Sequence, residues 1–185
     1  MTEEQNLILQ AQAGDNQAYG VLVQKYMKRA YFIALGLVGT HDSALDLSQE
    51  AFVKAFRALK KLDSNRNFFT WFYQILRNLC FNFLRDSSRH AVPFSEVGEY
   101  ALSQLDDGEP DAAANLEQNE LKEIMWQAIN QLKPNEREII ILKDFQEMSY
   151  NEIAEFLNCP TGTVMSRLYN ARKALKAKLE DYYGE

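Results

Sequence analysis

Residues 161–178 concentrate positive charge in a form suited to contact with nucleic acid. The segment has no acidic side chain and five basic ones, which are Arg167, Arg172, Lys173, Lys176 and Lys178. Cations near the end of a helix also complement the helix dipole, and that alternative explains Lys176 and Lys178 but not Arg167. An arginine can hold guanine through two hydrogen bonds, which is worth about 1–3 kcal/mol of discrimination between bases. The segment therefore predicts a helix that contacts DNA.

The candidate DNA contacts divide along this helix. Its first half would present short polar side chains and an arginine to base edges, whereas the later cations suit phosphates. The predicted DNA-binding residues are Thr161, Thr163, Ser166, Arg167, Asn170, Arg172 and Lys173.

A helix-turn-helix over residues 149–175 would position these side chains. Ser149 and Glu152 have the spacing of a capping box, in which each side chain binds an unpaired amide at the helix start. Asn158 tolerates the left-handed backbone of a tight turn, and Thr161 is placed to cap the second helix. The helices would pack through the small Ala154 and the apolar Ile153, Leu157, Val164 and Leu168.

Charge is unevenly distributed along the 185 residues. A hydrophobic content of 46% is enough for one modest core or two small ones. The net charge of −6 argues at first against a nucleic-acid binder. By segment, however, the formal charge is +3 over 1–90, −8 over 91–132 and −1 over 133–185. The acidity lies mainly in the middle of the chain and is compatible with a basic face elsewhere.

The hydrophobic pattern predicts an all-α fold, because apolar residues recur at steps of three and four and alternating β-branched runs are nearly absent. Helices are expected at 3–13, 16–37, 43–62, 67–87 and 116–132, from Pro134, and at 149–157 and 161–178. Residues 91–115 contain two prolines and two glycines but no basic residue, which is typical of a flexible linker. We expect an N-terminal helical bundle over 1–90 and a four-helix domain over 116–185, joined by this acidic linker.

No set of residues indicates catalysis or metal binding. The two histidines, His41 and His90, are not in a ligand-spaced cluster, and the sequence has no GxxxxGK, HExxH or GxSxG motif. Cys80 and Cys159 lack CxxC spacing, which fits a reducing cytosol, and each is expected to be a small buried hydrophobe. The apolar run 68–84 carries polar residues at helical spacing, so it predicts an amphipathic helix. We expect a cytoplasmic protein with no cofactor, metal, enzymatic activity or membrane insertion.

The segment LKPNEREIIILKDFQEMSYNEIAEFLNCPTGTVMSRLYNARKAL resembles the −35 reading domain of extracytoplasmic function (ECF) sigma factors, promoter-specificity subunits of the sigma-70 superfamily. AQAGDNQAYGVLVQKYMKRAYFIAL, SALDLSQEAFVKAFRALKKL and FFTWFYQILRNLCFNFLR are similar, in order, to the family's first domain. The resemblance implies that residues 1–90 bind core RNA polymerase and recognise and melt the −10 element, and that residues 116–185 recognise the −35 element. The implied partners are the largest-subunit clamp helices and the flap of bacterial core RNA polymerase, promoter DNA and an anti-sigma factor.

The resemblance also implies roles for side chains of the first domain. The segment 43–62 has an apolar stripe of Leu45, Phe52, Ala55, Leu59 and Leu62. Its other face would dock on the polymerase through Asp46, Gln49, Glu50, Val53 and Arg57. An unpaired −10 base and its backbone would be contacted by Thr70, Trp71, Asn78, Arg77, Arg66 and Lys54. At least three of the five aromatic residues between 68 and 73 are expected in the core.

Three positions depart from the family pattern. Gln74 and Met165 stand where the family usually has cations, and Asn158 stands where glycine is common. The resemblance further implies that the linker threads toward the RNA exit path, where the transcript would displace its carboxylates Asp106, Asp107, Glu109 and Asp111. The alternative function is a helix-turn-helix regulator that binds duplex DNA without being a polymerase subunit. That alternative predicts an effector or phosphoacceptor domain with a βα pattern, which the sequence does not contain.

Overall fold

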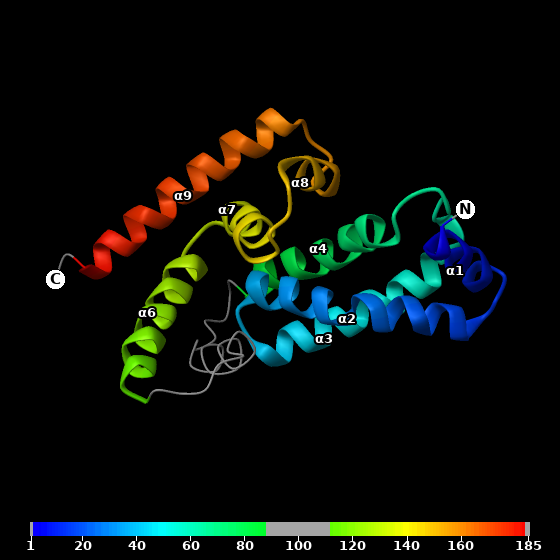
Figure 1. Ribbon diagram of the computed structural model, residues 1–185, viewed down its shortest axis with the longest axis horizontal. Coiled ribbons are helices and arrows are strands. Elements are labelled where there is room, and N and C mark those ends of the chain that lie inside the picture. Colours follow the sequence, from blue (N-terminus) through cyan, green and yellow to red (C-terminus); the bar gives the residue numbers. More distant parts are fainter. Residues whose placement is uncertain (1, 88–111, 184–185) are drawn as a thin grey trace.

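The computed structural model describes the backbone of residues 2–87 and 112–183 and the side chains of residues 2–86 and 121–182. Over these residues the fold is all-α, with two helical regions, as predicted (Figure 1). The first region comprises α1 (Glu3–Gln12), α2 (Asn16–Val38), α3 (His41–Ala58), a 3-10 turn (Leu59–Lys61) and α4 (Phe68–Ser87). The second comprises α6 (Ala112–Asn130), α7 (Pro134–Ile140), a π-helical turn (Ile141–Phe145), α8 (Tyr150–Phe156) and α9 (Thr161–Tyr183).

Helix boundaries differ from the predicted ones by a few residues. Helix α6 begins at Ala112, so the last residues of the predicted linker are helical. The remainder of that linker, with Asp106, Asp107, Glu109 and Asp111, lies outside the described residues, as does His90. The helix expected over 43–62 ends at Ala58 and continues as the 3-10 turn.

Side-chain caps explain where several helices begin. Thr2 and Gln5 form a capping box at α1, and the carboxylate of Asp15 accepts hydrogen bonds from the amides of Gln17 and Ala18 at α2. Each cap satisfies amides that have no partner inside the helix. The first turns of α1 and α2 are thereby fixed, and the two helices pack against each other.

Aromatic side chains fill the core of the first region. Phe68, Phe69, Phe72 and Tyr73 are at most 1% exposed, which confirms the prediction for this run, whereas Trp71 is half-buried. The ring of Phe72 stacks on that of Phe52 with centroids 4.2 Å apart. Helix α4 is therefore held against α2 and α3 along the side that carries these rings.

Two smaller predictions have different outcomes. Cys80 is buried, and burial raises the pKa of its thiol to about 12, so it is an unreactive apolar residue as predicted. Cys159 is only partly buried. Leu45 of the predicted apolar stripe is 38% exposed, whereas the other members of the stripe are buried. It lies at the edge of the stripe and lines a groove between α2 and α3.

The two helical regions pack directly against each other. Arg137 of α7 is 6% exposed and donates to the carbonyl oxygen of Leu37, the last residue but one of α2, at 2.5 Å. Its Nε donates to the carbonyl oxygen of Ile129 at 3.2 Å, and burial lowers the pKa of Arg137 to about 10. A single cluster of buried hydrophobic residues includes members of both regions, for example Ile8 of α1 and Ala171 of α9. The packing buries polar backbone atoms that Arg137 then satisfies.

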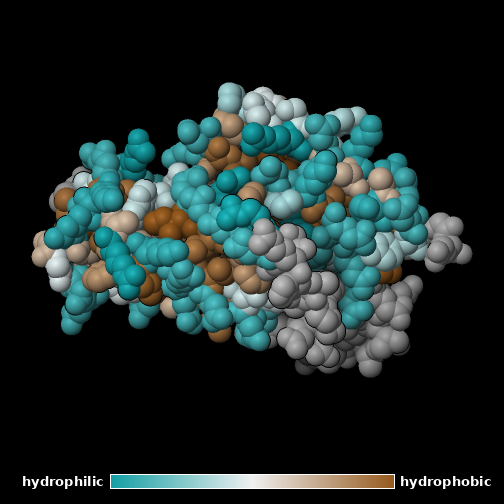
Figure 2. Space-filling view, turned by 180° about the vertical axis from the view of Figure 1, so that it is seen from behind, coloured by the Kyte–Doolittle hydropathy of each residue, from teal (hydrophilic) through white to brown (hydrophobic). Residues whose placement is uncertain are grey.

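Much of the face drawn in Figure 2 is hydrophilic. Figure 2 shows one face on which hydrophobic residues gather near the middle of the molecule among hydrophilic ones. Among the described helices, none has the length and hydropathy to cross a membrane.

Candidate nucleic-acid interface

Helices α8 and α9 form the predicted helix-turn-helix. The amide of Ser149 donates to Glu152 Oε2 at 2.7 Å, and the amide of Glu152 donates to Ser149 Oγ at 3.2 Å, which confirms the capping box. Asn158 has φ 48°, the left-handed conformation expected for the turn. Ile153, Val164 and Leu168 are at most 3% exposed and hold the two helices together. The local sequence thus sets the angle at which α9 leaves the turn.

The predicted contacts of α9 lie on one helix and most of them are exposed. Ser166, Arg167, Asn170, Arg172 and Lys173 are exposed, while Thr161 and Thr163 are half-buried. Thr161 Oγ1 donates to Asn151 Oδ1 at 3.3 Å, which ties the start of α9 to α8. Two apolar side chains join this surface, Met165 at 50% exposure and Tyr169 at 70%. Tyr169 was not among the predicted DNA contacts. Its position four residues after Met165, on the same face of the helix, was the signal that the sequence offered.

Two cations of α9 have acidic partners, Arg172 and Lys176, and Lys176 Nζ lies 3.5 Å from Glu180 Oε1. Arg172 Nη2 lies 2.5 Å from Asp144 Oδ1, and the hydrogen bond from Arg172 to Asp144 raises the pKa of Arg172. Arg172, Met165 and Tyr169 line a shallow cavity of 440 Å³ together with Tyr150, Leu168, Lys173 and Lys176. The surface therefore combines cationic, apolar and aromatic groups.

The start of α4 forms a second candidate site. A cavity of 570 Å³ is lined by Arg66, Asn67, Thr70, Trp71, Gln74, Glu155 and Asn158. Three residues predicted for the −10 element, Arg66, Thr70 and Trp71, meet here. Asn67 was missed, and its position before a helix start was the available signal. Its Oδ1 accepts from the amide of Thr70 at 2.9 Å and from Thr70 Oγ1 at 3.3 Å.

The structure does not bring the other predicted −10 residues into this cavity. Asn78 is exposed further along α4, and Lys54 of α3 pairs with Glu50 at 2.8 Å. Arg77 binds Glu138 of α7 instead, with Nε 2.5 Å from Oε1 and Nη2 3.0 Å from Oε2. Burial lowers the pKa of Arg77, but the bond to Glu138 outweighs burial and the net shift is upward.

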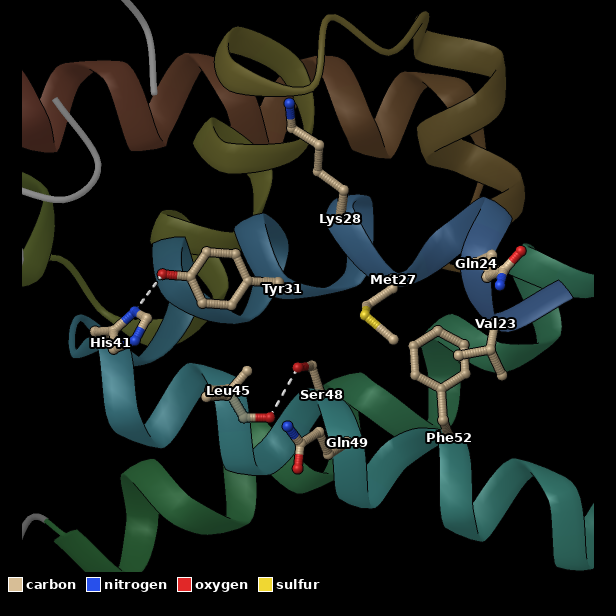
Figure 3. Close-up of a pocket in the computed structure, with 10 residues that line it drawn as sticks. All are labelled: Val23, Gln24, Met27, Lys28, Tyr31, His41, Leu45, Ser48, Gln49 and Phe52. Atoms are coloured by element: carbon tan, nitrogen blue, oxygen red, sulfur yellow. Dashed lines mark hydrogen bonds between the residues drawn. The ribbon is translucent and has the colours of Figure 1, made fainter. Parts of the chain in front are cut away.

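A third surface lies on α3. The five residues predicted to dock on polymerase, Asp46, Gln49, Glu50, Val53 and Arg57, are all exposed on this helix. Beside them is a groove of 460 Å³ between α2 and α3, lined by Val23, Gln24, Met27, Lys28, Tyr31, His41, Leu45, Ser48, Gln49 and Phe52. Figure 3 shows Met27 from α2 and Leu45 from α3 on opposite sides of it. Sequence reasoning missed Met27, which is 48% exposed.

Comparison with known proteins decides among the functions left open by this geometry. Residues 22–90 match the family model for sigma-70 region 2, and residues 122–175 match that for sigma-70 region 4. The chain is 33% identical over 187 residues to the RNA polymerase sigma-H factor of Pseudomonas aeruginosa, covering 96% of this chain and 94% of the relative.

The chain belongs to the ECF sigma factors of the sigma-70 family. It is also 32% identical over 182 residues to the ECF RNA polymerase sigma-E factor of Escherichia coli, again with 96% and 94% coverage. A solved structure of CnrH in complex with the cytosolic domain of CnrY superposes with a TM-score of 0.69 at 26% identity, covering 96% of this chain and 97% of that one.

Family membership confirms the predicted function. This ECF sigma factor is a non-enzymatic RNA polymerase subunit with region 2 and region 4 promoter-binding domains. A duplex-binding regulator has no need of region 2, so that alternative is set aside. The first helical region, with the α3 face and the α4 cavity, contains the region 2 match. The second, with the helix-turn-helix, contains the region 4 match.

Proposed function

We propose that this ECF sigma factor divides promoter recognition among the three surfaces described above. Helix α9 contacts the −35 duplex, the cavity at the start of α4 holds an unpaired base of the −10 element, and the exposed face of α3 docks on core RNA polymerase. The sigma factor supplies binding energy, and the polymerase supplies the chemistry.

Exposure and chemistry support the −35 role of α9. An α-helix fits the DNA major groove, and residues in the first half of a recognition helix reach base edges. Ser166, Arg167 and Asn170 are exposed in that half, and Lys173 follows on the same helix for phosphate contact. Met165, which replaces a cation usual in the family, offers an apolar contact of the kind that suits a thymine methyl group. The −35 preference should therefore depend on Arg167 most strongly.

The residues of α4 and of the preceding loop that line the cavity support the −10 role. An extruded base needs a slot with a stacking surface, hydrogen bonds to its edge and a cation for its phosphate. Trp71 provides an aromatic surface, Thr70 and Gln74 provide polar groups, and Arg66 provides the cation. The amide of Gln74 replaces the cation usual in the family and is suited to the base edge rather than to phosphate. We accordingly add Asn67 and Gln74 to the predicted −10 residues.

Apolar exposure on α3 supports the polymerase-docking role. Val53 is 50% exposed in the middle of a polar face, between Glu50 and Arg57. Cores of protein interfaces are depleted of charge, so an exposed valine framed by charged residues is typical of such a core. The groove with Met27 and Leu45 extends this apolar surface toward α2. The partner implied by the family resemblance is the clamp-helix pair of the largest polymerase subunit, with the flap as the partner of region 4.

A regulatory partner is the second part of the proposal. The similar protein CnrH is solved with the cytosolic domain of CnrY bound to it. We extend this to an anti-sigma factor that competes with polymerase for the α2–α3 groove of the present chain. Both encounters would take place in the cytoplasm, where core polymerase and promoter DNA are found.

The single observation that carries the proposal is that one chain combines a helix-turn-helix whose reading helix is exposed with a cavity at the start of α4 lined by Arg66, Thr70 and Trp71. Two weakly binding sites joined in one molecule gain affinity through effective concentration. Promoter specificity should therefore require both sites together.

Reconstitution tests this proposal. The chain is mixed with bacterial core polymerase and a promoter library, and transcript starts are sequenced. We expect a defined set of starts that is absent with core polymerase alone and that shares −10 and −35 motifs. If no start depends on the chain, while the chain alone binds one specific duplex, the regulator alternative is correct instead.

A further inference from the structure

Helix α1 binds both ends of the loop that connects the 3-10 turn to α4. At the beginning of the loop, Gln12 Nε2 donates to the carbonyl oxygens of Leu59 at 2.9 Å and Leu62 at 2.7 Å. At its end, Glu4 Oε1 accepts a hydrogen bond from the amide of Phe68 at 3.0 Å. Both side chains come from α1, so one helix fixes the points at which the chain enters and leaves this loop.

The amide of Phe68 needs an acceptor from outside α4. The first amides of a helix have no partner within it. Asn67 Oδ1 accepts from the amide of Thr70, and the amide of Phe68 is bound by Glu4 instead. Phe68 is fully buried, and the side chain of Glu4 is only 15% exposed. Because a buried amide without an acceptor is costly, the start of α4 is tied to the position of Glu4.

The carboxylate of Glu4 is itself held in place by α2. Its Oε2 accepts hydrogen bonds from Tyr26 Oη and from Lys25 Nζ, the latter at 2.9 Å. The ring of Tyr26 also stacks on those of Phe68 and Phe69, with centroids 5.8 Å and 4.9 Å apart. Glu4 therefore joins α1, α2 and the first residue of α4 at a single point.

The interior of the loop is folded by its own side chains. Asp63 Oδ1 accepts from the amide of Asn65 at 3.0 Å and from Asn65 Nδ2 at 3.1 Å. The carbonyl oxygen of Asp63 accepts from the amide of Arg66 at 2.9 Å. With Gln12 at one end and Glu4 at the other, the backbone of the loop is hydrogen-bonded along its length.

The loop and the first turn of α4 carry side chains that line the α4 cavity. Arg66, Asn67, Thr70 and Trp71 all lie within three positions of Phe68. A shift of the start of α4 would therefore move all four together. Binding sites that are about 1 Å too loose lose function even when every side chain is present.

We infer that α1 is part of the −10 reading site, in which Glu4 and Gln12 are positioning residues that hold the loop and the first turn of α4 in the conformation that receives the base. This inference rests on the proposed function of the α4 cavity. Helix α1 precedes residues 22–90, which match sigma-70 region 2, so it adds a segment outside that match to −10 reading. Glu4 and Gln12 act through the backbone of the loop, and a loop that is already ordered binds without a further ordering cost.

Transcription by core polymerase with the full-length chain tests the inference. The templates are one promoter from the library and its single-base variants at the −10 and −35 elements. Discrimination is the ratio of transcription from the parent promoter to that from a variant. Loss of folded protein lowers both activities alike, so it does not change this ratio. We expect Glu4→Ala to lower −10 discrimination by at least about fivefold and to leave −35 discrimination unchanged within about twofold.

Matched variants separate positioning from charge and packing. Glu4→Gln keeps an oxygen acceptor for the amide of Phe68 and should retain most of the −10 discrimination. Glu3→Ala removes the same charge at the exposed neighbouring position and should alter neither ratio. Gln12→Met keeps the length of the side chain without its donors and should lower −10 discrimination alone. Gln10→Met, at an exposed position of α1, is its control.

Hydrogen exchange on the parent chain covers the case in which Glu4→Ala and Gln12→Met fail to fold. The amide of Phe68 should exchange slowly, although it is the first of its helix. Rapid exchange of this amide would overturn the inference. So would unchanged −10 discrimination in folded Glu4→Ala and Gln12→Met, or equal losses at −10 and −35. Chain-dependent transcript starts would persist in each of these cases, whereas failure of the proposed function would abolish them.

Discussion

Ile141 occupies the space that a side chain at Gly36 would need. A Cβ atom at position 36 would lie 2.7 Å from Ile141 Cδ1 and 2.9 Å from Cγ1. Gly36 belongs to α2, and Ile141 begins the π-helical turn after α7. The two helical regions can approach this closely because residue 36 has no side chain. Both residues are buried, so the contact belongs to the shared packing of the two regions.

Gly36→Ala should destabilise the protein. Overpacking of a buried contact costs about 1–3 kcal/mol, and Ile141 is β-branched and stiff, so it cannot turn aside without moving its backbone. Urea unfolding should show this loss in the free energy of unfolding. In an Ile141→Ala background, which has a cavity cost of its own, Gly36→Ala should cost less than in the parent, because the shorter side chain at residue 141 makes room. Strict additivity of the two single changes would contradict the contact.

Gly20→Ala is the matched control on the same helix. A Cβ atom at position 20 would meet nothing within 4 Å. Alanine is a better helix former than glycine, so this change should stabilise the protein by roughly 0.5–1 kcal/mol. Opposite signs for the two substitutions in one unfolding series are the expected result.

Glu4 should make stability depend on acid pH. Burial by itself raises the pKa of Glu4, but hydrogen bonds from Tyr26, Lys25 and the amide of Phe68 outweigh it, and the net pKa is lowered. Lys25 Nζ lies 2.9 Å and the Phe68 amide 3.0 Å from this carboxylate. Its contribution is therefore fully present above the usual pKa of about 4.5 and is lost as the pH falls through the lower folded-state pKa.

Glu4→Gln should remove that dependence and cost about 1–3 kcal/mol at neutral pH, since it weakens bonds to a charged acceptor. Unfolding of both proteins at a series of pH values between neutrality and acid measures the effect. The stability difference should shrink toward acid pH. A difference that stays constant would show that Glu4 acts through packing alone.

Sequence reasoning succeeded where the physical cause is local. The capping box of Ser149 and Glu152 depends on residues three apart, and the left-handed turn at Asn158 depends on a single residue. Helix periodicity likewise identified the buried aromatic side of α4. Boundaries were less exact, since the end of α3 passes into a 3-10 turn whose geometry is set by contacts with α1.

Contacts between distant segments were beyond such reasoning. The hydrogen bond from Gln74 to Phe156 joins residues 82 positions apart, and that from Arg77 to Glu138 joins residues 61 apart. The spacing of apolar residues along a helix does not specify which other helix it will pack against. The acidic segment suggested two separate domains, and the shared core became visible only in the structure. For the same reason the contact between Arg77 and Glu138 was not foreseen when Arg77 was predicted to contact DNA.

Arg167→Ala should lower transcription from promoters selected by the −35 element. Its exposed side chain in the first half of α9 is the proposed base contact, and a bidentate contact to guanine contributes about 1–3 kcal/mol. We expect an activity loss of roughly 5–150-fold at the parent promoter and a smaller loss at promoters altered at the contacted base. In vitro transcription on a set of single-base −35 variants measures this.

Lys176→Ala separates base reading from charge. Lys176 is exposed two turns after Tyr169, in the later half of α9 whose cations suit phosphates, and its Nζ lies 3.5 Å from Glu180 Oε1. Its loss should weaken all promoters by a similar factor and reduce the salt dependence of binding. If Arg167→Ala gave this same uniform pattern, Arg167 would be a phosphate contact.

Val53→Glu should weaken binding to core RNA polymerase while leaving the fold intact. Val53 is 50% exposed, so a longer polar side chain is accommodated in the free protein. At the centre of an interface the new carboxylate would lose its water without gaining a partner, and burial of an unpaired charge is costly. A penalty above about 1.4 kcal/mol corresponds to at least a tenfold loss of affinity.

Val21→Glu is the control, because Val21 has a similar exposure of 46% but lies on α2 outside the predicted docking face. Fluorescence titration with core polymerase should separate the two variants by that factor at equal thermal stability, and equal affinities would remove Val53 from the docking surface.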